Sequence, residues 1–230
     1  MGKEEHIIMV IPRTDLFETD SLEDSPQGFL ASDDYDFTHA IKNNFQWMRR
    51  GNASEPKEKS AESNANFKQP IAYSVIINKN TKKIFAYKRA PHGANYNESR
   101  LAGNWSWGVG GHIEKIDQEN ETDGLKIVEK SRDREMTEET TVQELDEPIL
   151  LGYINDDTNS VGSVHVGILY LIYTQQENIA LADQEGVACD WKSIDELENL
   201  CQKAKNNDEQ VKVDTWSEIA LTPIKELLEQ

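Results

Sequence analysis

The sequence predicts an α/β protein in which helices lie on both faces of a mixed β-sheet, an α/β/α sandwich. Strand patterns and helix patterns alternate through most of the chain, in the order hairpin, helix, strands, helix. The segment Val164–Thr174 is almost entirely apolar, as expected for a strand buried on both faces. A chain of 230 residues that is 37% hydrophobic and contains five Trp can bury a sizeable core.

The charge balance limits the partners that the chain can take. It carries 24 basic and 42 acidic residues, a formal net charge of −18. Nucleic acid polymers and anionic membranes bind basic surfaces, so we expect neither as a partner. A nucleotide substrate is still compatible, because bound metal ions can supply local positive charge.

Composition also points to the cytoplasm. No apolar run approaches the roughly 20 residues of a membrane span, and the start MGKEEHII lacks the layout of a signal peptide. Cys189 and Cys201 show no CxxC spacing and imply no disulfide framework. We therefore expect a soluble, cytoplasmic protein.

Residues 1–67 are predicted to form an N-terminal extension packed on the main domain. His6–Ile11 has the pattern of a strand, and Phe37–Arg50 has that of an amphipathic helix. Between them, Asp15–Asp36 is acidic and rich in turn residues. Gly51–Asn66 has no aromatic or branched apolar side chain, so we expect a mobile loop or linker.

The main domain is predicted to span residues 68–230 and to begin with β-structure. Ile71–Asn78 and Lys83–Lys88 flank a turn-like connector and read as a hairpin. Asn104–Val109 predicts another strand, which leads into the pair Gly110-Gly111. Gly111 would permit a backbone approach that a side chain would block.

A long helix is expected after this glycine pair, from about Asp123 or Gly124 to about Thr140, with Glu114–Asp123 as a loop before it. The remaining predicted elements are the strands Pro148–Asn155, Val164–Thr174 and Gly186–Trp191, a helix capped by Ser193, and the C-terminal helix Trp216–Leu228.

Three acidic residues share one face of the long helix. Glu135, Glu138 and Glu139 are spaced i, i+3 and i+4, so their like charges repel one another. Mg²⁺ or Mn²⁺ reverses this repulsion, because hard cations prefer carboxylate oxygens. Acidic faces are also common on solvated helices, so the glutamates alone do not decide between a metal site and a surface.

The surrounding pattern resembles the signature of the Nudix hydrolases, called the box below: Gly, five residues, Glu, seven residues, Arg-Glu-apolar-x-Glu-Glu-x-Gly-apolar. The matching residues are Gly111, Arg134, Glu135, Met136, Glu138, Glu139 and Val142. Asp117 stands in place of the first Glu, and sixteen residues instead of seven separate it from Arg134. Thr141 replaces the last glycine, so we expect a different helix exit that runs straight into a following strand.

The resemblance implies a Nudix-like fold from about residue 68 to the C-terminus and a metal-dependent pyrophosphohydrolase. The substrate would be a nucleoside diphosphate linked to another moiety, and the cofactor Mg²⁺ or Mn²⁺. Glu135 and Glu139 would be metal ligands, with Glu138 sharing the site directly or through water and the Gly111 carbonyl adding a ligand. Arg134 would orient a glutamate through a bidentate hydrogen bond.

Further site residues follow from the same resemblance. Glu185-Gly186 stands six residues before Trp191, as in some family members, which favours Glu185 as a metal ligand or general base. Asp183 and Asp190 are alternatives; Asp156 and Asp157 better fit a turn. His112 and Arg89 are candidates for substrate contacts, although a hydrogen-bonded structural histidine and a surface charge are equally open.

Two other functions compete with hydrolysis for this sequence. A non-catalytic Nudix-like module that binds a nucleotide as a sensor is the main alternative, and the complete set Arg134, Glu135, Glu138 and Glu139 argues against it. An isopentenyl diphosphate isomerase, which shares the fold, would need a reactive cysteine near the box. Many Nudix proteins form homodimers, but this sequence reveals neither an interface nor the substrate.

Overall fold

The computed structural model describes residues 2–90, 102–143, 145–182, 186–206 and 211–229. The chain forms two compact units. The first comprises Met1–Tyr73, Gly110–Arg134 and Leu151–Ile168, and the second comprises Ser74–Val109, Glu135–Leu150 and Leu169–Gln230. Four elements contribute residues to both units: β4 (Phe67–Asn78), α4 (Gly124–Glu139), β7 (Ile149–Asn155) and β8 (His165–Thr174). The division into residues 1–67 and 68–230 stays a prediction.

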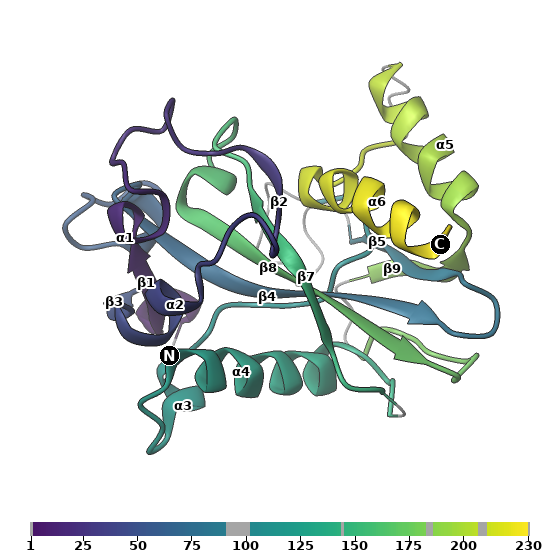
Figure 1. The fold of residues 1–230 in the computed structure, drawn as a ribbon, viewed down its shortest axis with the longest axis horizontal. Helices are drawn as coiled ribbons and strands as arrows, with labels where there is room; N and C mark the ends of the chain where they lie inside the picture. Colours follow the sequence, from purple (N-terminus) through teal and green to yellow (C-terminus); the bar gives the residue numbers. More distant parts are fainter. Residues whose placement is uncertain (1, 91–101, 144, 183–185, 207–210, 230) are drawn as a thin grey trace. The chain divides into compact units, whose positions relative to one another are not determined.

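Strands of the first unit are hydrogen-bonded in the order β2-β7-β8-β4-β1-β3. The three strands that lie wholly in this unit are β1 (Ile7–Pro12), β2 (Gly28–Ala31) and β3 (Gln46–Arg49). β1 lies between β3 and β4 and is antiparallel to both, with Ile8 opposite Met48 and Ile11 opposite Lys68. The purple and blue arrows of Figure 1 show β1 beside β3. The predicted first strand is therefore confirmed.

The predicted helix Phe37–Arg50 is wrong in its second half. Only α2 (Thr38–Asn43) is helical, and β3 follows it directly. Two consecutive asparagines, Asn43 and Asn44, stand at the break, and asparagine is a poor helix former. The residues beyond them gain backbone hydrogen bonds by pairing with β1. Tertiary pairing has overridden the apolar spacing that suggested a longer helix.

The polar stretch Gly51–Asn66 is not a loose linker. It contains the 3₁₀ turn η2 (Ala61–Ser63), and Ser60, Glu62 and Asn64 are all buried. Hydrogen bonds replace apolar contacts there: the Ser60 hydroxyl donates to the backbone carbonyls of Arg50 and Asn52 at 3.0 and 2.9 Å. Composition does not predict this packing, because it counts apolar side chains and does not register the hydrogen bonds that let polar groups be buried.

Helices also fill two places where loops or turns were expected. The turn-rich passage Asp15–Asp36 begins within α1 (Arg13–Phe17) and also contains the strand β2. The loop predicted at Glu114–Asp123 contains α3 (Lys115–Gln118). α4 then begins at Gly124, as predicted, with the Asp123 carboxylate accepting the backbone N–H of Leu125 at 3.0 Å. Glycine is needed at this start, because a Cβ there would lie 2.0 Å from the Ile41 carbonyl oxygen.

The second unit is arranged around β5 (Ile84–Arg89), which pairs antiparallel with β4, β6 (Trp105–Ser106) and β9 (Gly186–Lys192). The strand predicted at Asn104–Val109 is thus much shorter, although Val109 still exchanges hydrogen bonds with Ser74 at 2.8 and 2.9 Å. One apolar cluster in the core of the second unit contains Ile76, Phe85, Tyr87, Val109, Met136, Val142 and Ile172.

Helices α5 (Ile194–Lys205) and α6 (Thr215–Leu228) complete the second unit and lie side by side (Figure 1). Lys225 of α6 forms an ion pair with Glu198 of α5 at 2.7 Å. The predicted cap is confirmed, since Ser193 Oγ accepts the backbone N–H of Glu196 at 3.2 Å. The α/β class is confirmed as well. Within the described ranges, no helix combines the length and apolarity needed to cross a bilayer.

Candidate functional site

The box arginine is held by the acid that stands in place of the first box glutamate. Arg134 Nε and Nη2 donate to the two carboxylate oxygens of Asp117 at 2.7 and 3.0 Å. The Asp117 side chain is only 3% exposed, so this bidentate pair is shielded from water. Arg134 Nη2 also donates to the His112 carbonyl at 3.1 Å, which ties α4 to α3 and to the segment after the glycine pair.

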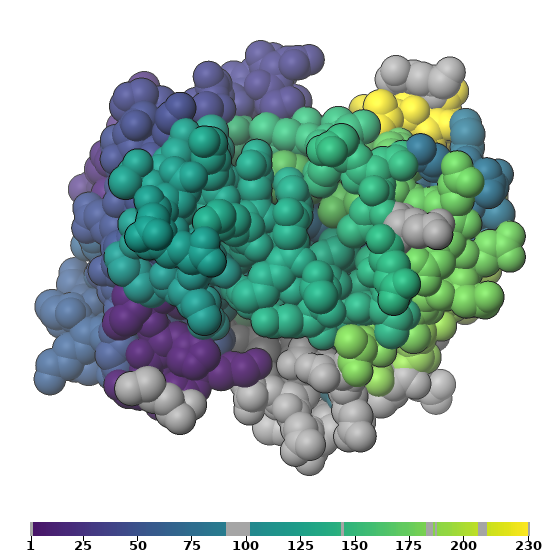
Figure 2. Space-filling view, turned by 90° about the horizontal axis from the view of Figure 1, so that it is seen from below, coloured from purple at the N-terminus to yellow at the C-terminus, as the bar shows by residue number. Residues whose placement is uncertain are grey.

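The three box glutamates lie on the last turns of α4, within the second unit. Glu135 and Glu139 are half-buried, whereas Glu138 is exposed. Met136, between them in sequence, is 3% exposed and packs into the core of this unit, which fixes the rotation of the helix. The outward surfaces of α3 and α4 appear in teal in Figure 2.

This donor set fits a hard divalent cation. The side chains offered by the helix face are all carboxylates, and Mg²⁺ and Mn²⁺ favour oxygen ligands. Glu135 and Glu139 are one helical turn apart and sit at the boundary between core and surface. A carboxylate at such a boundary can be oriented by neighbouring protein atoms and still bind a cation from solvent.

The helix exit differs from that of a glycine stop, as predicted. Thr141 exchanges two hydrogen bonds with Ala180, its N–H donating to the Ala180 carbonyl and its hydroxyl accepting the Ala180 N–H, both at 2.9 Å. The Glu139 carbonyl accepts the Ala182 N–H at 2.8 Å. The chain does not run straight into a strand, however, because β7 begins only at Ile149.

The other predicted site residues, Arg89, Gly111 and Glu185, lie outside α4. Arg89 ends β5, half-buried, with its guanidinium 5.3 Å from the centre of the Tyr87 ring. The neighbouring Gly110 makes a close backbone approach, since a Cβ there would lie 2.3 Å from the Ala72 carbonyl oxygen; the approach expected at Gly111 stays a prediction. Glu185 lies outside the described residues.

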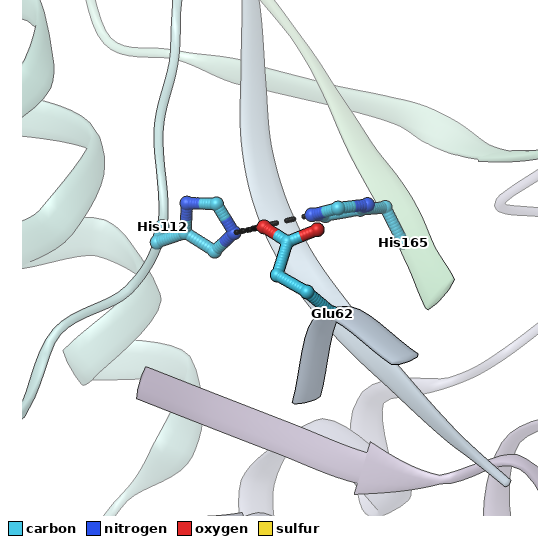
Figure 3. Close-up of side chains that lie close together, drawn as sticks. All are labelled: Glu62, His112 and His165. Atoms are coloured by element: carbon cyan, nitrogen blue, oxygen red, sulfur yellow. Dashed lines mark hydrogen bonds and ion pairs between the residues drawn. The ribbon is translucent and has the colours of Figure 1, made fainter. Parts of the chain in front are cut away.

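His112 belongs to a buried polar cluster in the first unit, shown in Figure 3. Its Nε2 lies 2.8 Å from Gln69 Oε1, 3.1 Å from His165 Nε2 and 3.7 Å from Glu62 Oε1. The ligand-type atoms of Glu62, His112 and His165 all lie within 4.8 Å of one another. Three segments far apart in sequence therefore deliver two imidazoles and a carboxylate to one point.

A buried ion cluster lies beside the start of β8, the strand that begins at His165. Asp157 accepts hydrogen bonds from Arg13 Nη2 at 2.9 Å and from Lys68 Nζ at 2.7 Å, and both cationic side chains are 0% exposed. Lys68 Nζ also donates to the carbonyl of His165 at 3.1 Å. The cluster thereby fixes the backbone at the start of β8.

Burial sets the protonation of this cluster. Desolvation lowers the pKa of Lys68 to about 8, with the charge of Arg13 adding to the effect and Asp157 opposing it. Burial also disfavours the Asp157 carboxylate, but hydrogen bonds from Arg13, Lys68 and Gln27 outweigh it and hold the pKa of Asp157 far below its ordinary value. Asp157 thus lies in a turn, as predicted, and also binds the two buried cations of the cluster.

Comparison with known proteins adds a family. No protein-family model matches the chain. Protein YmaB of Bacillus subtilis is 34% identical over 226 residues, which covers 96% of this chain and 98% of YmaB. The crystal structure of Tm1382, provisionally assigned to the Nudix hydrolases, superposes with a TM-score of 0.70 at 23% identity and covers 96% of this chain and 99% of Tm1382. A Nudix hydrolase of Alicyclobacillus acidocaldarius gives 0.51 at 12% identity and covers 68% of this chain and 90% of its own.

The chain belongs to the YmaB family and has the Nudix fold. The predicted Nudix-like α/β/α sandwich is therefore confirmed. In this YmaB-family protein, sequence reasoning found the acidic helix face but missed Glu62, Gln69 and the partnership of the two histidines. Glu62 stands in a stretch whose composition suggested a linker. No spacing signal connects it to His112 or His165, since only the folded chain brings them together.

Proposed function

We propose that this protein hydrolyses a pyrophosphate bond in a nucleoside diphosphate linked to another moiety. The observation that carries the proposal is the Arg134-Glu135-x-x-Glu138-Glu139 face of α4 in a chain with the Nudix fold. Glu135 and Glu139 are half-buried, lie one helical turn apart and carry like charges, and a bound cation would relieve their repulsion. This arrangement favours a metal-dependent enzyme over a solvated helix face without a site.

In this proposal Glu135 and Glu139 hold Mg²⁺ or Mn²⁺, and Glu138, at the exposed edge, contributes directly or through water. When bound, such a cation neutralises phosphate oxygens and makes a neighbouring water more acidic. Arg134 keeps α4 in register by its paired hydrogen bonds to Asp117. Arg134 thus acts on the box through the helix and does not need to touch phosphate.

Several further assignments stay part of the proposal. Glu185 would serve as an additional metal ligand or general base, Gly111 would offer its carbonyl to the metal, and Arg89 and His112 would contact the substrate. We expect a small nucleotide-type substrate and no nucleic acid polymer or membrane, given the net charge of −18. We also propose a homodimer in the cytoplasm, where the free thiols of Cys189 and Cys201 would stay reduced.

The test is a substrate screen with the purified protein. Nucleoside diphosphates linked to sugars, nucleosides or coenzymes are incubated with Mg²⁺, with Mn²⁺ or with EDTA, and phosphate-containing products are separated by chromatography. We expect at least one substrate to be cleaved at the pyrophosphate bond with either metal and none in EDTA. Absence of turnover across the panel with both metals would contradict the proposal.

The same panel of nucleotides distinguishes a hydrolase from a non-catalytic module that binds a nucleotide as a sensor. A nucleotide that raises the unfolding temperature without being cleaved indicates binding without catalysis. That outcome would reject hydrolysis while leaving the fold unaffected.

A further inference from the structure

We propose that Glu62, His112 and His165 form a second metal site, which takes one transition-type divalent cation of the Zn²⁺ class. All three residues lie in the first unit, and none of them belongs to the box on α4. The site goes beyond the proposed hydrolysis, because neither its ligands nor the metal they select follow from the acidic helix face. In this inference the His112 side chain binds the metal and no longer serves as a substrate contact.

The spacing of the ligand atoms suits a single ion. Two nitrogens bound to one tetrahedral Zn²⁺, each about 2.0 Å from the metal, lie about 3.3 Å apart. The Nε2 atoms of His112 and His165 are 3.1 Å apart, and the Glu62 carboxylate oxygen is 3.7 Å from the His112 nitrogen. Figure 3 shows the carboxylate and both rings directed toward one another.

The tautomer of His165 leaves the correct nitrogen for a metal. Its Nδ1 lies 2.7 Å from the carbonyl of Val161, and a carbonyl can only accept, so Nδ1 carries the hydrogen. In the neutral ring Nε2 then has a lone pair directed at His112. A backbone carbonyl that fixes the ring in this way is the usual outer-shell partner of a metal-bound histidine.

The other two ligands are also held from outside the cluster. Arg50 Nε donates to Glu62 Oε1 at 3.1 Å, which orients the carboxylate. His112 is held through its own backbone, whose carbonyl accepts a hydrogen bond from Arg134. Glu62 and His165 are 5% and 4% exposed, so the pair needs partners in the interior.

Gln69 supplies an independent sign of a missing ligand. It is 1% exposed, and its Oε1 lies 2.8 Å from His112 Nε2, so the amide group is directed into the cluster. Its amide nitrogen is buried with no hydrogen-bond partner among the described residues. A metal that carries a water or hydroxide beside the amide would give that N–H group an acceptor. Because Gln69 Oε1 can only accept a hydrogen bond, and the assigned tautomer makes His165 Nε2 an acceptor as well, His112 Nε2 carries a hydrogen in the metal-free protein. A bound cation would take the place of this hydrogen.

The donor set selects the kind of ion. Imidazole nitrogen suits Zn²⁺ and other late first-row metals, whereas Mg²⁺ prefers an all-oxygen shell. Three protein ligands leave at least one coordination position open for water or another ligand. We therefore assign the cluster to a Zn²⁺-class ion and the carboxylate face of α4 to Mg²⁺ or Mn²⁺.

The test measures metal binding and needs no substrate. Protein freed of any polyhistidine tag and treated with chelator is titrated with Zn²⁺, and with Co²⁺ as a coloured substitute. We expect one tightly bound equivalent of Zn²⁺ and visible Co²⁺ absorption of low coordination number. His112→Gln, His165→Gln and Glu62→Gln should each weaken Zn²⁺ binding by more than about 100-fold, since even outer-shell losses cost 10–100-fold.

Two controls separate this site from the box. His39→Gln removes a histidine from α2 of the same unit and should leave Zn²⁺ affinity unchanged. Glu139→Gln should also leave it unchanged, because the proposed ligands include no α4 acid. If Glu139→Gln abolishes Zn²⁺ binding while His112→Gln and His165→Gln retain it, the proposal is overturned.

A measurement on the unaltered protein covers variants that fail to fold. X-ray absorption at the zinc edge of the wild-type complex should show two imidazole nitrogens in the first coordination shell. A shell of oxygens alone, or no Zn²⁺ binding up to millimolar concentration, would refute the site. Failure of the hydrolysis screen would not affect either readout.

Discussion

The substitution Asp157→Asn tests whether the buried ion cluster stabilises the first unit. Asp157 accepts hydrogen bonds from Arg13 at 2.9 and 3.0 Å, from Lys68 at 2.7 Å and from Gln27 at 2.8 Å. Asparagine keeps the shape of the side chain but removes its charge. The two buried cations, Arg13 and Lys68, would then lose the carboxylate to which both are hydrogen-bonded.

The expected cost follows from the burial of these groups. Arg13 and Lys68 are 0% exposed and Asp157 is 5% exposed, so solvent screens their charges poorly. Removing one partner of a buried ion pair typically costs about 3–5 kcal/mol. Lys68 can relieve part of this cost by losing its proton, because burial has already lowered its pKa to about 8. We therefore expect a loss of about 3 kcal/mol, a large fraction of the roughly 5–15 kcal/mol of a typical domain.

The assay is urea unfolding at pH 7, followed by circular dichroism and by tryptophan fluorescence. Asp133→Asn is the matched control, since Asp133 is 68% exposed and its ion pair with Arg132 should contribute less than about 1 kcal/mol. If Asp157→Asn lowers the free energy of unfolding no more than the control does, the cluster is not a determinant of stability.

Three more outcomes follow from the structure. The pKa of Lys68 is about 8 in the folded chain against an ordinary 10.5, so the unfolded chain binds more protons between pH 8 and 10.5. The free energy of unfolding should therefore rise with pH in this range, by about 3 kcal/mol. Lys68→Met should flatten this pH dependence, and an unchanged slope in the variant would exclude Lys68 as the cause. Gly110→Ala places a Cβ 2.3 Å from the Ala72 carbonyl and should cost about 1–3 kcal/mol in urea unfolding, whereas Gly2→Ala, with nothing within 4 Å, should cost almost nothing; equal stabilities would show that the backbone gives way. Arg134→Lys cannot donate the paired hydrogen bonds to Asp117 and should lower kcat/KM about 10- to 100-fold at unchanged metal dependence; activity within about twofold of wild type would remove Arg134 from the positioning role.

Local sequence signals best predicted the elements shared by the two units and those of the second unit. The hairpin of β4 and β5, the helix α4, the Ser193 cap and the strands β7, β8 and β9 all appear near their predicted places. Each has a strong short-range pattern, either alternation, a long apolar run or a helical repeat. The box acids on α4 were found for the same reason, because helical spacing alone puts Glu135 and Glu139 on one face.

The first unit depends on contacts between distant residues and was predicted less well. The pairing of β3 with β1 converts the second half of an apparent helix into a strand. Ser60, Glu62 and Asn64 are buried through hydrogen bonds that composition does not register. The Arg13–Asp157 pair and the Glu62, His112 and His165 cluster join residues at least 50 positions apart, so no local spacing could predict them.

The central claim is that the α4 carboxylates support metal-dependent hydrolysis. The most direct measurement compares kcat/KM of wild type, Glu139→Gln and Glu129→Gln in saturating Mg²⁺ on the best substrate of the screen. Glu129 is an exposed residue of the same helix, so its substitution matches the change in charge. We predict a loss of more than about 100-fold for Glu139→Gln, beyond the range of outer-shell changes, and a loss of less than about threefold for Glu129→Gln. Equal activity of the two variants would contradict the assignment of the site to α4.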